Sequence, residues 1–175
     1  ETNREFANEC GVDFHGPSTS VVDHFSHALD AQEGTHTSIV AKFTPESSRI
    51  AQSGAAPVIY RGVGHSVNAD NPLLCTVLTG SSTSYSHNPA KPVTGAPEAT
   101  GTDTRLVSAV QARNNARVVF AGSPELFSNA FFNAPVTTSD GKTFEKSGNE
   151  AFATALSQWT FKERGVLRAV NFTHG

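Results

Sequence analysis

Apolar and β-branched residues mark two neighbouring strands near the middle of the chain. The two runs are 105–112 and 116–122, and Asn114 and Asn115 lie between them. Asparagine tolerates the positive φ angles that a tight hairpin turn requires. The pattern therefore predicts an antiparallel hairpin with its turn at these two asparagines.

Three segments carry the signals of helices. The first runs from Thr2 to Gly11, with Glu5 at capping-box spacing and a glycine able to end the helix. The second begins at Ser123, where a hydroxyl cap precedes a proline and an acid. The third, 149–164, is the strongest, because its apolar stripe is broad enough to pack against a sheet. The stripe consists of Phe152, Ala155, Leu156, Trp159 and Phe161.

Several shorter runs predict further strands. They are 21–22, 35–43, 57–60 and 166–170, while 72–78 is apolar but ambiguous in its period. A polar excursion over 135–147 carries Asp140-Gly141, which predicts an exposed hairpin turn. Strands mixed with packed helices indicate the α/β class, arranged in layers around a mixed sheet.

Residues 79–104 interrupt this pattern, because Ser, Thr, Pro and Gly make up much of the segment. In a compact domain such a composition predicts a long ordered loop rather than a linker. Loops of this length tend to carry function.

Length and charge narrow the range of functions. A chain of 175 residues has the length of one domain. Its net charge of -3 gives no long-range attraction for phosphate backbones, so we exclude nucleic acid as a partner. No apolar window approaches the ~20 residues that cross a bilayer. The chain has no methionine and no signal peptide, so we expect a soluble piece excised from a longer protein.

Blocks along most of the chain are similar to one known family. They include Asn8-Glu-Cys-Gly-Val-Asp-Phe14, Val21-Val-Asp-His24, Tyr60-Arg-Gly-Val-Gly64, Asn71-Pro-Leu-Leu, 106–132 and 156–167. The most specific block is Leu78-Thr-Gly-Ser-Ser-Thr-Ser-Tyr-Ser86. With these blocks the sequence resembles the non-catalytic, single-span Wbp1-type subunit of the endoplasmic reticulum oligosaccharyltransferase.

The resemblance implies a fold, a role and a compartment. The implied fold is a layered Rossmann-like or glutamine-amidotransferase-like sandwich, with 1–175 forming a single luminal domain or the larger part of one. The implied role is a non-catalytic scaffold, without catalytic residues, metal or cofactor. Its complex would transfer a preassembled oligosaccharide from dolichyl diphosphate to Asn in Asn-X-Ser/Thr sequons. Expected partners are the other subunits and the donor oligosaccharide or nascent polypeptide, in the endoplasmic reticulum lumen beneath a membrane-anchored parent.

The hydroxyl-rich run after residue 78 is the candidate contact surface for a partner or a glycan. Hydroxyls, main-chain donors and an aromatic ring suit a sugar or a protein surface, although such loops also hydrogen-bond to themselves. The candidate residues are Thr79, Gly80, Ser81, Ser82, Thr83, Tyr85, Arg113, Asn114 and Asn115. A glycan-binding module centred on Tyr85 and Trp159 is the alternative, but the buried stripe already explains Trp159.

Two other groups contain residue types that occur in reactive sites. Ser123 stands where a hydrolase or amidotransferase-like enzyme would carry its nucleophile, but its role as a helix cap explains it fully. Asp23, His24, His27 and His36 include the ligand types of zinc, yet their spacing fits no established site, so we expect loop or structural roles.

Two features bear on processing in an oxidising compartment. Asn171 begins an Asn-Phe-Thr glycosylation sequon. Cys10 and Cys75 permit one disulfide, and the residues alone leave the pairing open. The family resemblance favours two free thiols.

Overall fold

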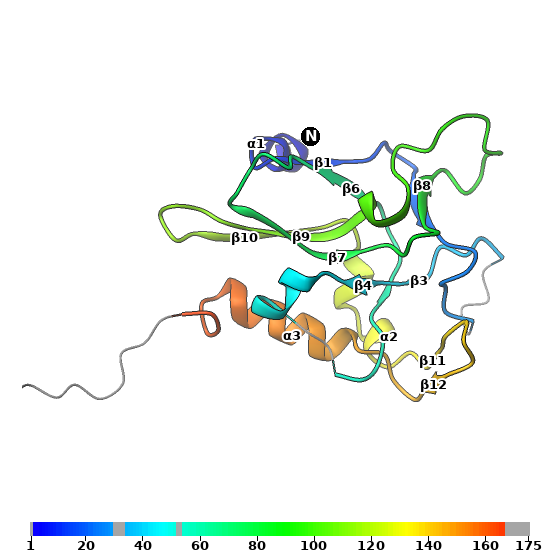
Figure 1. Cartoon of the computed structure of the whole chain (residues 1–175). Coiled ribbons are helices and arrows are strands. Elements are labelled where there is room, and N and C mark those ends of the chain that lie inside the picture. Colours follow the sequence, from blue (N-terminus) through cyan, green and yellow to red (C-terminus); the bar gives the residue numbers. More distant parts are fainter. Residues whose placement is uncertain (1, 30–33, 52–53, 167–175) are drawn as a thin grey trace, which may run out of the picture.

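The computed structural model describes residues 2–29, 34–51 and 54–166 (Figure 1). Its helices are α1 (Thr2–Glu9), α2 (Asn129–Phe132) and α3 (Asn149–Thr160), with 3-10 turns η1 (Pro45–Arg49), η2 (Gly101–Asp103) and η3 (Pro124–Phe127). Its strands are β1 (Val12–Phe14), β2 (Ser20–Val22), β3 (Ile39–Val40), β4 (Lys42–Phe43), β5 (Ile59–Tyr60), β6 (His65–Val67), β7 (Leu74–Thr79), β8 (Tyr85–His87), β9 (Arg105–Gln111), β10 (Arg117–Ala121), β11 (Val136–Thr137) and β12 (Thr143–Phe144).

The main sheet has six strands in the order β1-β6-β9-β7-β4, and β10 also pairs with β9. Small two-stranded pairs, β2-β8, β3-β5 and β11-β12, complete the described strands. The predicted α/β class is confirmed. The mixed sheet was a wrong expectation, because every pairing between the described strands is antiparallel.

Helices lie on the two faces of the sheet (Figure 1). On one face α1 packs through Ala7 against Val12, Val110 and Phe120. On the other face, α3 buries Phe152, Leu156 and other side chains in the larger core cluster with the sheet. Three layers result, and burial of apolar area on both faces supplies the main stabilisation.

The predicted hairpin is confirmed, with a different turn. The Asn115 N–H donates to the Ala112 carbonyl at 2.8 Å, and the Ala112 N–H donates to the Ala116 carbonyl at 2.9 Å. Of the two asparagines only Asn115 has a positive φ, +66°. The loop is therefore not a two-residue turn but a three-residue loop, 113–115, that ends in one left-handed residue. Such loops are the next most common hairpin connection after two-residue turns.

The third predicted helix is confirmed, but it ends earlier than predicted. Because α3 stops at Thr160, Phe161 leaves the stripe and is 78% exposed, whereas Trp159 is buried as expected. The Arg117 guanidinium donates to the Trp159 carbonyl at 2.6 Å and lies 4.6 Å above its ring, which ties the end of α3 to β10. The strand predicted over 166–170 falls almost entirely outside the described residues.

The sequence pattern missed several short elements. β1, β6 and β8 have only three residues each, and the sequences Val-Asp-Phe, His-Ser-Val and Tyr-Ser-His carry little apolar signal. β8 lies inside the segment predicted as a long loop. These strands form because hydrogen bonds and packing against neighbouring strands stabilise them, although the local sequence has little β-propensity.

Asn149 joins α3 to the strand β5. Its side chain accepts the Ile59 N–H and donates to the Ile59 carbonyl, both at 2.9 Å, and it is fully buried. We expect Asn149→Ala to lower the free energy of unfolding by about 2 kcal/mol, because two buried backbone groups lose their partner. Urea denaturation checks this against Glu150→Ala, an exposed neighbour expected to change stability by less than about 1 kcal/mol. Equal losses in the two variants would contradict the assignment.

Candidate functional site

Asp23 organises the hydroxyl loop, which we define as residues 79–85. Its buried carboxylate accepts the backbone N–H groups of Phe25 and Ser26 at 2.9 and 2.8 Å. It also accepts the hydroxyls of Thr83, at 2.8 Å, and of Ser81. Burial alone would raise the pKa of Asp23, but these hydrogen bonds outweigh it and lower the pKa below its ordinary value.

The hydroxyl loop is partly self-satisfied and partly open. Thr79, Gly80, Ser81 and Ser84 are buried, and the Ser84 hydroxyl donates to the Ser81 carbonyl at 2.9 Å. Ser82 and Thr83 are exposed and Tyr85 is half-buried. Beside them lies a hollow of about 330 Å³, the Tyr85 hollow, lined by Ser82, Thr83, Ser84, Tyr85, Val93, Pro97 and Thr100.

Not all of the predicted surface residues come together. Thr79 pairs with Arg105 at the start of β9, whereas Arg113, Asn114 and Asn115 follow the end of that strand. Six residues of extended chain span about 20 Å, so the exposed hairpin tip is remote from the hydroxyl loop. The single surface predicted from the sequence is therefore wrong, and only its 79–85 part gathers.

Three histidines gather beside Tyr85. The Nδ1 atoms of His24 and His36 are 2.6 Å apart, and His24 Nε2 lies 2.9 Å from the Tyr85 hydroxyl. The His27 ring stacks on the His36 ring with centroids 4.2 Å apart. Within the described ranges, no group of three or more His, Cys, Asp or Glu side chains is arranged to hold a metal ion. These contacts join the side chains of His24, His27 and His36 to Tyr85 at the end of the hydroxyl loop.

The histidine cluster has a consequence for titration. Burial and the neighbouring His27 and His24 lower the pKa of His36 from its ordinary value of 6.5. We expect its ring to stay neutral to a lower pH than a free histidine, because a second or third positive charge would face the others. Between its lowered pKa and the ordinary value of 6.5, the folded state binds fewer protons than the unfolded state, so stability should fall as the pH falls through that range. NMR titration of the His36 ring checks this, and His27→Gln should move the midpoint upward. An unchanged midpoint would contradict the coupling.

Ser123 is engaged as a helix cap. Its hydroxyl accepts the Leu126 N–H at 3.3 Å, and the residue is 1% exposed. The helix predicted from Ser123 is instead the 3-10 turn η3, and Ser128 then caps α2 by accepting the Phe131 N–H at 3.2 Å. This geometry supports the interpretation of Ser123 as a cap at the start of η3.

Both cysteines are free, half-buried thiols. Cys10 follows α1 on one face of the sheet, and Cys75 packs against the core cluster on the other. Burial raises the pKa of each thiol, so neither is activated as a nucleophile. Asn171 lies outside the described residues, so its sequon stays a prediction.

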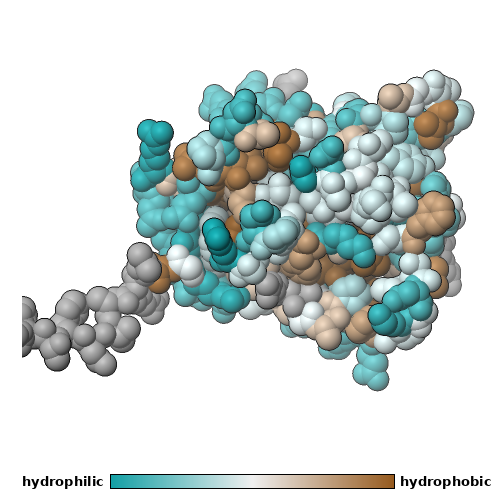
Figure 2. All heavy atoms as spheres, viewed as in Figure 1, coloured by the Kyte–Doolittle hydropathy of each residue, from teal (hydrophilic) through white to brown (hydrophobic). Residues whose placement is uncertain are grey.

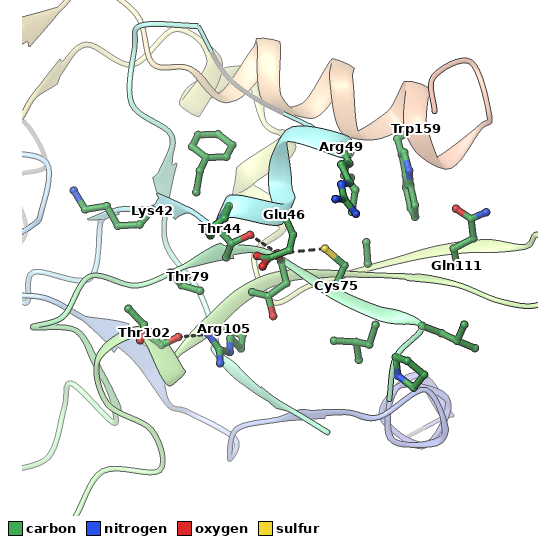
Figure 3. Close-up of a pocket in the computed structure, with 18 residues that line it drawn as sticks. Lys42, Thr44, Glu46, Arg49, Cys75, Thr79, Thr102, Arg105, Gln111 and Trp159 are labelled. Atoms are coloured by element: carbon green, nitrogen blue, oxygen red, sulfur yellow. Dashed lines mark hydrogen bonds between the residues drawn. The ribbon is translucent and has the colours of Figure 1, made fainter. Parts of the chain in front are cut away.

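One cavity was not predicted from the sequence. It has a volume of about 780 Å³ and lies between the sheet, η1 and the end of α3 (Figure 3). We call it the sheet–helix groove. Its lining includes Lys42, Glu46, Arg49, Cys75, Thr79, Arg105, Gln111 and Trp159. The available sequence signal was the alternation along β9, whose outer members Arg105 and Gln111 are polar while Ala109 between them is small.

The sequence comparison places the domain in a known class. A family model described as "OST48, N-terminal domain" matches residues 1–163, and the chain therefore belongs to this family. The family predicted from the sequence is thus confirmed. No helix within the part of the chain that the structure describes is long and apolar enough to cross a membrane.

Curated relatives carry one name. The chain is 46% identical to the Dolichyl-diphosphooligosaccharide--protein glycosyltransferase 48 kDa subunit of Danio rerio, over 98% of this chain and 40% of the relative. Proteins of the same name from Arabidopsis thaliana and Drosophila melanogaster are 45% and 40% identical, with the same coverage. The chain spans about 40% of the length of these relatives.

Proposed function

We propose that the chain is a luminal scaffold domain of the oligosaccharyltransferase complex in the endoplasmic reticulum. In this role it holds other subunits of the complex in place while another subunit transfers the oligosaccharide from dolichyl diphosphate to Asn in Asn-X-Ser/Thr sequons. The name of the relatives, which denotes one subunit of a glycosyltransferase, supports membership in such a complex. A domain of such a subunit acts through its surfaces.

Two observations favour a scaffold over a transferase. The Ser123 hydroxyl, at the position where an amidotransferase-like fold would place its nucleophile, is buried and accepts the Leu126 N–H. The Asp23 carboxylate likewise accepts hydrogen bonds from four donors of its own chain. Groups that are locked into structural hydrogen bonds cannot readily serve as base or nucleophile.

Two measurements test the proposal. First, the purified chain is incubated with a lipid-linked oligosaccharide donor, divalent metal and a sequon peptide, and no glycopeptide is expected. Second, the matching part of a 48 kDa subunit is replaced by this chain, and the complex is isolated. The swapped subunit should be recovered with the other subunits. Transfer by the chain alone, or recovery of the swapped subunit without the others, would contradict the scaffold role.

A second candidate function is contact with the donor glycan at the Tyr85 hollow. The exposed Ser82 beside the Tyr85 ring favours it, because sugars combine hydroxyl hydrogen bonds with stacking on aromatic faces. NMR titration with free donor oligosaccharide should shift amides of 79–85 and leave those of 113–115 unchanged. Tyr85→Ala should abolish the shifts, while Tyr85→Phe keeps the ring. A flat response at millimolar sugar would remove this candidate.

A further inference from the structure

The sheet–helix groove has a floor set by strand register. Lys42 pairs with Thr79, and Thr79 pairs with Arg105, so these three side chains form one row across β4, β7 and β9. Cys75 pairs with Ala109 farther along the same floor. Directly opposed residues in an antiparallel sheet project to the same face, so the row and the Cys75–Ala109 pair line one surface.

The floor has the length of a short extended peptide. From Arg105 to Gln111 it follows β9 for six residue steps, which is about 20 Å at the rise of a strand. A segment of roughly six extended residues covers the same distance. Thr44, Thr76, Thr79 and Thr102 line the groove. The Thr44 hydroxyl donates to the Thr76 carbonyl at 2.6 Å and Thr79 is buried, so the exposed Thr102 and the half-buried Thr76 are the members of this set that can meet the polar groups of a peptide backbone.

The two ends of the groove differ in chemistry. Figure 3 shows Lys42 and Arg105 toward one end, and Arg49 and Trp159 toward the other. The lining carries three cations, Lys42, Arg49 and Arg105, against one acid, Glu46, although the chain as a whole has a net charge of -3. Asp103 pairs with Arg105 at 3.3 Å but is not part of the lining.

The Trp159 end of the groove is lined by apolar side chains. Ile50 and Trp159 are buried in the main core cluster, while Pro72 and Leu73 are exposed to solvent. In the space-filling view, apolar and hydrophilic atoms are interspersed in the middle of this face, over β4, β7 and η1 (Figure 2). A large apolar side chain entering here would cover the exposed Pro72 and Leu73 beside Trp159, while an acidic one would meet the Lys42–Arg105 row.

We propose that the sheet–helix groove binds an extended peptide segment of a neighbouring protein, with a carboxylate side chain at the Lys42–Arg105 end and an aromatic or large aliphatic side chain at the Trp159 end. This inference rests on the proposed scaffold role in one respect, which is that the bound segment belongs to another protein of the same complex. The groove itself recognises charge, extended backbone and one apolar anchor.

The chain supplies two reporters of occupancy. Trp159 is the one tryptophan of the chain and lines the groove, so its fluorescence reports a bound side chain directly. Cys75 also lines the groove, whereas Cys10, the other free thiol, does not. A bound peptide should slow thiol labelling at Cys75 and leave labelling at Cys10 unchanged.

The probe is a capped hexapeptide, Glu-Thr-Val-Thr-Val-Phe, together with its reversed sequence because the direction of the bound segment is open. Forms with Gln or Lys in place of Glu are the matched controls. We expect the Glu form to bind about threefold more tightly than the Gln form and about tenfold more tightly than the Lys form at low salt, with the difference shrinking as salt is added. Trp159 emission and the labelling rate of Cys75 are the readouts.

A charge reversal completes the test. Lys42→Glu should weaken the Glu peptide by about fivefold and narrow its advantage over the Lys form, because an exposed charge contributes modestly. Lys91→Glu, an equally exposed change outside the groove, should leave binding unchanged. No response of Trp159 and Cys75 to millimolar peptide, or equal affinity for the Glu and Lys forms, would overturn the proposal. If the peptide did not bind but the swapped subunit still joined the complex, the groove proposal would fail and the scaffold role would stand. If the peptide bound as expected but the swapped subunit did not join the complex, the scaffold role would fail and peptide binding by the groove would stand.

Discussion

Gly122→Ala is expected to lower the free energy of unfolding by about 3 kcal/mol or more. A Cβ atom at this position would lie 2.0 Å from the Val63 carbonyl oxygen and 3.0 Å from the Tyr60 hydroxyl. The chain cannot move aside cheaply, because the Val63 N–H donates to the Gly122 carbonyl at 3.0 Å and the Tyr60 hydroxyl donates to the Val63 carbonyl at 2.7 Å. Urea denaturation measures the loss.

Gly95→Ala is the matched control for this substitution. Gly95 has open space where its Cβ would be, so the variant should be neutral or gain up to about 1 kcal/mol from the stiffer unfolded chain. If the two alanine variants unfolded at the same urea concentration, the close backbone crossing at Gly122 would not limit stability. The comparison separates contact in the folded state from the general effect of removing a glycine.

Asp23→Ala is expected to cost about 3 to 4 kcal/mol, because it leaves two backbone N–H groups and two hydroxyls without their buried acceptor. The hydroxyl loop should lose its order first, since both hydroxyls belong to it. Amide exchange at 79–85 and urea denaturation are the measurements. Asp103→Ala, which removes an exposed carboxylate, should change stability by less than about 1 kcal/mol.

Acid should imitate the loss of Asp23. Because the folded-state pKa of Asp23 is lowered, its contribution is fully present above the ordinary carboxyl pKa and is lost as the pH falls through the lowered value. Asp23→Asn should therefore flatten this part of the acid dependence below the ordinary carboxyl pKa. An unaltered acid profile in that variant would mean that other groups carry the effect.

The sequence predicted best where local chemistry and tertiary packing agree. The hairpin β9–β10 and the helix α3 follow from residue type and period alone, since an asparagine turn and an apolar stripe act over a few residues. The family blocks also predicted the class of the domain. Phe161 was placed wrongly because the helix end depends on how Arg117 ties down the last carbonyls.

Features that depend on distant partners escaped prediction. β6 and β8 are polar triplets that become strands only when β1 and β2 pair with them. The gathering of His24, His36 and Tyr85 joins residues up to 61 positions apart, and no spacing rule announces it. The sheet–helix groove lies between the sheet, η1 and α3. The alternation along β9 indicates only the face that forms its floor, and the walls have no sequence pattern of their own.

The position of β9 in the sheet determines when the domain can assemble during synthesis. β1 can pair with β6, and β4 with β7, as soon as each is made, but among the described strands only β9 pairs with both β6 and β7. The two early strand pairs therefore stay separate, with apolar faces uncovered, until the ribosome has produced residue 111. After that point the β9–β10 hairpin closes over a few residues and joins them, so a pause in translation before β9 would prolong the state most prone to aggregation.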